Sequence, residues 1–239
     1  MRRCALRAFW KMKIPNVYLL TALFVCCLIA LSSCASPRTI MPVSILHDRI
    51  DGTPSVRGGI ILVKPFQDGR PRSQRPYIGE THEPPLPPLP ILLIPVPSGR
   101  FIVERNGANV ALVLTSCFAE ALKEIGYTSL LSTAPSPSQS EIASLSPNAV
   151  LEGEIKEFWL TPSWTTKHLI RVQLKLYDKE GNDLLWEKEI RAEHSEFVGV
   201  WSSAAFEEVI KKALAKALNQ AANEFVSDDF KLKVCEKSK

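Results

Sequence analysis

Beyond its first 34 residues the chain is poor in cysteine and has no excess of either charge. Only Cys117 and Cys235 lie there, so no disulfide framework is visible; two free thiols are expected, with one bridge as the alternative. Five of the 29 basic residues lie in the first 33 positions, which hold no acid and leave 24 basic against 25 acidic residues. This balance predicts no nucleic-acid partner.

Catalytic and metal-binding motifs are also missing. The sequence contains no nucleophile elbow, phosphate-binding loop, HExxH motif or paired CxxC motif. Each of the four histidines is expected at the surface or in a turn, at His47, His82, His168 and His194. We therefore predict no catalytic residue, no cofactor, no metal and no small-molecule substrate. A hydrolase that lacks any familiar motif is the alternative.

What the sequence does have is a targeting segment at its N-terminus. Residues 1–16 carry five basic residues and no acid, and residues 17–31 (VYLLTALFVCCLIAL) form an apolar stretch of 15. This pattern is typical of a secretory signal, and the stretch is short for a helix that spans a bilayer. We predict a signal peptide over residues 1–33, with an uncleaved anchor helix as the alternative.

Leu31-Ser32-Ser33-Cys34 resembles the lipobox of bacterial lipoproteins, in which one aliphatic and two small residues precede a cysteine. Small side chains give the peptidase access to the bond before the cysteine, whose thiol takes a diacylglyceryl group. The resemblance implies lipidation at Cys34 and a membrane tether of acyl chains. Ala35 and Ser36 lack the aspartate associated with inner-membrane retention, which implies the periplasmic face of the outer membrane. A cleaved signal with a chance cysteine is the alternative.

The rest of the chain predicts a single α+β domain over residues 56–230, after a flexible tether (34–55) and before a short tail (231–239). The expected order is β-α-β-(α)-β-β-β-α. Strands are predicted at 56–66, 128–132, 149–160, 168–178 and 183–197, and helices at 109–125, about 140–146 and about 203–226.

The last three strands show the clearest pattern. In HLIRVQLKLYD (168–178), four aliphatic residues alternate with polar ones, and DKEGN (178–182) offers Gly181 for a tight turn. This alternation predicts a mainly antiparallel sheet with the two long helices on one face. The other face is expected to carry charge pairs of Glu152 and Glu154 with Arg171 and Lys175.

Residues 67–100 form a proline-rich insert within the predicted domain. Seven of the 18 prolines lie between 84 and 97, so extended or polyproline II chain is expected there. We hypothesise that 84–97 are a recognition surface; the alternative is that ILLIPV (91–96) packs on its own domain. Arg70, Arg72 and Arg75 are candidates to contact an anionic lipid head group or a glycan, against the alternative of a solvated loop.

Over about residues 56–230 the chain resembles the YajG-type family of small bacterial lipoproteins. The resemblance is carried by FAEALKEIGY (118–127), VLEGEI (150–155), the DKEGN hairpin and the segment 192–229. It implies an α+β lipoprotein domain and supplies no catalytic residue. We predict a non-enzymatic, lipid-anchored module with a protein partner in the cell envelope. An auxiliary lipoprotein of an envelope lipid or lipopolysaccharide transport system is the alternative.

Overall fold

A computed structural model gives the fold of the unit that begins at Thr39. The structure describes residues 39–43, 58–75, 77–80, 99–103, 110–132, 138–163, 165–199 and 202–235. The predicted signal peptide, Cys34, residues 81–98 of the insert, His47 and His82 lie outside these ranges.

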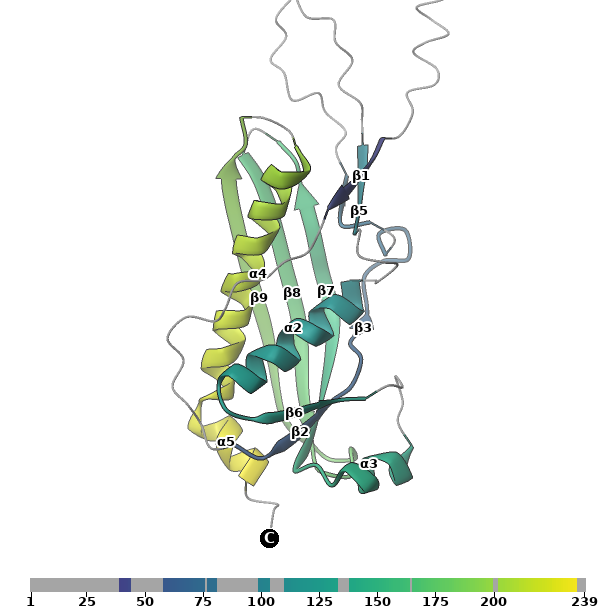
Figure 1. Cartoon of the computed structure of the whole chain (residues 1–239), viewed down its shortest axis with the longest axis vertical. Helices are drawn as coiled ribbons and strands as arrows, with labels where there is room; N and C mark the ends of the chain where they lie inside the picture. Colours follow the sequence, from purple (N-terminus) through teal and green to yellow (C-terminus); the bar gives the residue numbers. More distant parts are fainter. Residues whose placement is uncertain are drawn as a thin grey trace, which may run out of the picture. The chain divides into compact units, whose positions relative to one another are not determined.

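The described residues form nine strands and four helices (Figure 1). All nine strands belong to one open sheet, in which some neighbours are parallel and others antiparallel. The strands are β1 (Thr39–Val43), β2 (Ile60–Val63), β3 (Gln67–Asp68), β4 (Gly79–Glu80), β5 (Gly99–Val103), β6 (Thr128–Leu131), β7 (Ala149–Thr161), β8 (Thr165–Tyr177) and β9 (Leu184–Phe197). The helices are α2 (Val110–Glu124), α3 (Gln139–Leu145), α4 (Ser203–Phe225) and α5 (Asp228–Cys235). The expected α+β domain is confirmed.

Strands β7, β8 and β9 form an antiparallel meander of 13, 13 and 14 residues. The four aliphatic residues of β8 that alternate with polar ones point inward, as predicted: Ile170, Val172, Leu174 and Leu176. A bulge between Ile155 and Glu157 in β7 shifts the register by one residue, so Phe158 and Leu160 also face the core. Gly181 closes the turn between β8 and β9 with φ of +77°, where a side chain would be strained.

Short strands extend the sheet beyond β7. β2, β3 and β4 pair with β7 one after another, and each pairing is parallel. β6 pairs with β2, β5 with β4, and β1 with β5. The structure here differs from the sequence prediction, because 67–100 contain β3, β4 and the start of β5, and the expected tether contains β1.

Helices α2 and α4 cover one face of the sheet, as predicted, and their apolar stripes join one core. The stripe of α2 includes Leu114, Phe118 and Leu122, and that of α4 includes Phe206, Leu214 and Phe225. Tyr127, just past α2, donates its hydroxyl to the Phe225 carbonyl at 3.0 Å and ties the two helix ends together.

Two further features lie outside this arrangement. The seven-residue helix α3 packs through Ile142 on Leu62 and Val150, in a separate small core cluster. Helix α5 ends at Cys235, so part of the segment 231–239 that was predicted to be a tail is helical. The helix buries Phe230 against Trp186 and Phe225. Among the described residues, no helix combines the length and the apolar character needed to cross a membrane.

Candidate functional site

The face of the meander opposite α4 is a surface of paired charges. Side chains of β7, β8 and β9 stand in rows there, because the strands are in register. Lys167 lies 2.8 Å from Glu193, and Lys175 lies 3.5 Å from Glu187. These side chains are 36–44% exposed, so the pairs are open to solvent. The face therefore carries charge pairs, as predicted, but the predicted partners are wrong.

None of the expected pairs is present, because Glu152 and Glu154 form no ion pair with Arg171 or Lys175. Glu152 lies opposite Lys175 in the ladder, but its short contact, 2.6 Å, is with Lys64. Glu154 pairs with Lys156 at 2.6 Å, and its ladder neighbour on β8 is Gln173. Arg171 lies 3.9 Å from Glu157, which the bulge in β7 brings to this face.

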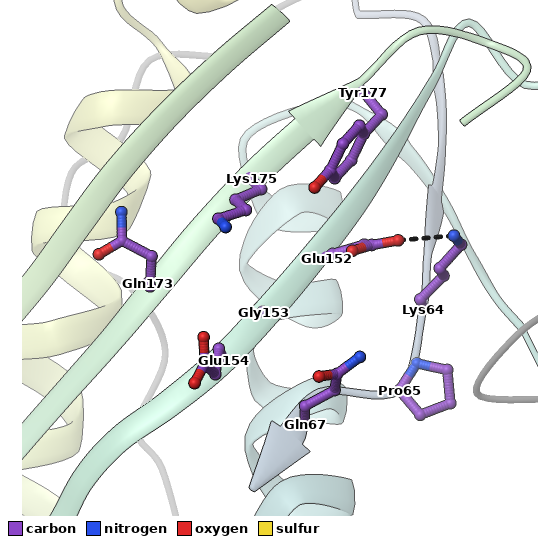
Figure 2. Close-up of a pocket in the computed structure, with 9 residues that line it drawn as sticks. All are labelled: Lys64, Pro65, Gln67, Glu152, Gly153, Glu154, Gln173, Lys175 and Tyr177. Atoms are coloured by element: carbon purple, nitrogen blue, oxygen red, sulfur yellow. Dashed lines mark hydrogen bonds and ion pairs between the residues drawn. The ribbon is translucent and has the colours of Figure 1, made fainter. Parts of the chain in front are cut away.

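A shallow pocket lies at the β2 side of this face (Figure 2). Its walls are the segment that follows β2 and the facing parts of β7 and β8. The lining residues are Lys64, Pro65, Gln67, Glu152, Gly153, Glu154, Gln173, Lys175 and Tyr177. Lys64 is the most enclosed of the four charged residues of the pocket, with 14% of its side chain exposed.

The pocket is lined mainly by polar and charged side chains. Its ionisable groups are two lysines, two glutamates and one tyrosine, and none of the nine residues of Figure 2 is a histidine, cysteine, serine or threonine. Within the described part of the chain, His, Cys, Asp and Glu side chains form no group of three that could hold a metal ion. The predicted absence of cofactors and metals concerns the whole chain and stays a prediction.

Arg70 is a structural residue, which contradicts its candidacy for an anionic ligand. Its side chain is 1% exposed, and all five of its guanidinium N–H groups have acceptors. Two donate to the Asp68 carboxylate, at 2.9 and 2.7 Å. The others donate to the carbonyl oxygens of Tyr77, Phe158 and Arg75. No donor remains for a phosphate or a glycan.

The other two arginines of this loop have different surroundings. Arg75 donates from Nε to the Arg70 carbonyl at 3.0 Å, which helps to hold the loop closed. Arg72 and Arg75 are both exposed, as the alternative of a solvated loop predicts for them.

His168 is fully buried, and its predicted place at the surface or in a turn is wrong. It lies in the inward row of β8, with its ring 4.5 Å from that of Phe158 in an edge-on contact. Neither ring nitrogen has a hydrogen-bond partner. Burial, and secondarily the positive charge of Arg70, lower the pKa of His168 from 6.5 to about 3, so the ring is neutral.

His194 is half-buried on β9 and lies in a cluster with Glu196 of the same strand and Lys212 of α4. Glu196 accepts from Lys212 at 2.6 Å and lies 3.1 Å from the His194 ring. These two hydrogen bonds lower the pKa of Glu196, and the bond to Glu196 raises the pKa of Lys212. The cluster joins the C-terminal end of β9 to α4.

Comparison with known proteins gives structural likeness only. No family model matches the chain, and no curated protein matches it in sequence. A Xanthomonas campestris protein of the DUF330 family is similar in structure, with TM-score 0.46 and 13% identity, over 79% of this chain and 94% of that one. The hypothetical protein CT253 of Chlamydia trachomatis has a TM-score of 0.44 and 14% identity, over 75% of this chain and 99% of that one. Lipoprotein GNA1162 of Neisseria meningitidis has a TM-score of 0.37 and 15% identity, over 69% of this chain and 98% of that one.

Likenesses with TM-scores below 0.5 carry no inference about activity, ligand or partner. Membership of the YajG-type family therefore stays a prediction. The same holds for lipidation at Cys34, which lies outside the described residues.

Proposed function

We propose that the chain is a bacterial lipoprotein, anchored by acyl chains at Cys34, that acts without catalysis as an interaction module in the cell envelope. The observation that carries the proposal is the sequence from 1 to 34: basic residues, an apolar stretch, then Leu31-Ser32-Ser33-Cys34. The proposed location is the periplasmic face of the outer membrane, since Ala35 and Ser36 follow the cysteine.

The described structure supports a binding role better than a catalytic one. The exposed face of the meander carries charge pairs, and its pocket is lined by amides, carboxylates, amines and one phenol. Such a surface suits polar contacts with another macromolecule. A polar lining also offers little to an acyl chain, which disfavours the alternative of a lipid-transport auxiliary.

Replacement of Cys34 tests the anchor. We expect Cys34→Ser in the full chain to accumulate as an unprocessed precursor that incorporates no fatty-acid label. Cys27→Ser is the matched control, because it removes a thiol seven residues earlier, inside the apolar stretch, and should leave processing and labelling unchanged. Normal processing and labelling of Cys34→Ser would refute the proposal.

We propose that the proline-rich segment 84–97 is the surface that recognises the partner, and its replacement tests this role. A stiff segment loses little conformational entropy when it docks, and surface loops tolerate replacement. Exchange of 84–97 for a short Gly/Ser linker should remove envelope crosslinks and leave the melting temperature nearly unchanged. A large loss of stability would instead show that these residues belong to the core. Lipid that co-purifies with the chain would favour the transport alternative.

A further inference from the structure

Strand β9 forms a long border of the sheet. Among the described residues it pairs with β8 and with no other strand. In an antiparallel ladder the N–H and C=O groups of alternate residues point away from the neighbouring strand. On β9 these residues include Glu189, Arg191, Glu193 and Ser195. An edge of this length is a template on which another strand can pair.

Helix α4 occupies two of these outward groups with its own side chains. The Arg191 N–H donates to Oε1 of Gln220 at 3.2 Å. The Nζ of Lys216 donates to the Glu193 carbonyl oxygen at 3.2 Å. Lys216 and Gln220 are one helical turn apart on α4, which runs alongside β9 (Figure 1).

The charges of β9 fit a second copy of the same strand. Charged side chains usually protect an edge by repulsion. Here the charge alternates in sign along Glu189, Arg191 and Glu193, the residues whose backbone groups point away from β8. If two β9 strands paired antiparallel about position 192, Arg191 of each copy would lie opposite Glu193 of the other. Glu189 would face the uncharged Ser195, so no like charges would oppose each other among these residues.

That register would use the two groups that α4 already holds. In a hydrogen-bonded antiparallel pair, the Arg191 N–H of one copy would donate to the Glu193 carbonyl of the other. We propose that the β9 edge is a surface complementary to a second copy of this chain, and that Gln220 and Lys216 block it. In this role α4 protects the edge, in addition to covering the core.

The test removes both blocking side chains from the full chain in mild detergent. We expect Lys216→Ala with Gln220→Ala to self-associate at concentrations about tenfold or more below any at which the parent chain does, because the outward groups lose their bonds. Mass is measured by light scattering over a dilution series. Hydrogen exchange of the β9 peptide, measured at the same concentrations, shows whether that edge is the surface involved.

Three further variants make the result specific. Lys123→Ala with Asn223→Ala removes the same kinds of side chain from exposed helical positions and should behave as the parent does. Lys216→Arg with Gln220→Glu keeps the donor and the acceptor and should also match the parent. Addition of Arg191→Glu to the double alanine variant places two glutamates opposite each other and should reverse the association.

The proposal is overturned if the double alanine variant keeps the mass and the β9 exchange of the parent. It is equally overturned if the lysine-and-asparagine control associates to the same extent, or if the parent chain already protects β9 from exchange in a concentration-dependent way.

Discussion

The outer edges of β7 and β9 differ in what covers them. β7 meets main chain at three places along its length, from β2, β3 and β4 in turn. The loop between β3 and β4 is closed on itself by Arg70, whose bond to the Phe158 carbonyl reaches β7 directly. Among the described residues no strand pairs with the free edge of β9, where side chains of Lys216 and Gln220 of α4 form hydrogen bonds.

This difference shows two ways to finish a sheet. Backbone pairing at β7 leaves no free groups along the paired stretches, but it needs a loop whose shape depends on a buried ion pair. Side-chain capping at β9 needs no extra strand, but long flexible side chains are easily displaced. We therefore expect damage at the β7 side to unfold the protein, and damage at the β9 side to change what the protein associates with.

The largest effect is expected from Asp68→Ala. The variant leaves the buried Arg70 guanidinium without its carboxylate, and loss of one partner of a buried pair costs about 3–5 kcal/mol. The free energy of unfolding is measured by denaturant titration. Glu189→Ala, an acid on the open β9 edge, should change it by less than about 0.5 kcal/mol. Equal effects of the two variants would contradict the assignment of Arg70 as the residue that closes the loop.

Leu214→Ala tests the core that both edges share. Leu214 is fully buried in the middle of α4, so we expect a loss of about 2–5 kcal/mol in unfolding free energy. Leu232→Ala, on an exposed leucine of α5 (52% exposed), is the matched control and should cost far less. A loss below about 0.5 kcal/mol for Leu214→Ala would mean that α4 packs loosely.

A pH effect is expected from His168, which lies in the core beside β7. The unfolded chain binds a proton at this ring below pH 6.5, whereas the folded chain does not until about pH 3. The contribution of the neutral ring to the free energy of unfolding is fully present above pH 6.5. It is lost as the pH falls from 6.5 towards 3. Between pH 7 and 4.5 the loss is about 2–3 kcal/mol.

His168→Leu removes this titration. We expect its unfolding free energy to fall less steeply with acid than that of the parent, whatever its absolute stability. His194→Leu is the control, since that ring is only half-buried and pairs with Glu196. Parallel pH profiles for the parent and His168→Leu would show that the buried ring does not stay neutral.

The smallest effect is expected on the open face of the meander. Lys167→Ala breaks a pair whose side chains are 44% and 41% exposed, so the cost should be under about 1 kcal/mol and should shrink in salt. Lys64→Ala breaks the more enclosed pair with Glu152 and should cost more. If the order of the two were reversed, the exposed pairs of β9 would contribute more than the half-buried pocket.

The sequence predicts the meander and the two long helices well, because their signals are local. Alternation in β8 and the stripes of α2 and α4 need only neighbouring residues to be visible. The same alternation places position 168 in the inward row with Ile170, so the burial of His168 follows from a pattern that the expectation of a surface residue overlooked.

The short strands leave no such signal. β3 and β4 have two residues each, too few for a period, and their partners on β7 lie far along the chain. Arg70 has the appearance of a solvated loop residue, because its five acceptors come from carbonyl oxygens and one aspartate that only the folded loop assembles. The blocking role of Gln220 likewise depends on where α4 lies over β9.

The pairing of β2 also has a consequence for the order of folding. Ile60, which begins β2, and Lys64, which directly follows it, each bond to residues 88 positions later in the chain. Synthesis from the N-terminus therefore produces the apolar strand Ile60–Val63 long before β7 exists to receive it. The hairpins of β7, β8 and β9 join neighbouring segments, whereas both partners of β2, the strands β6 and β7, lie far along the chain. Until these partners have been made, β2 is an unpaired apolar strand, and we expect it to be the segment that a chaperone would have to protect.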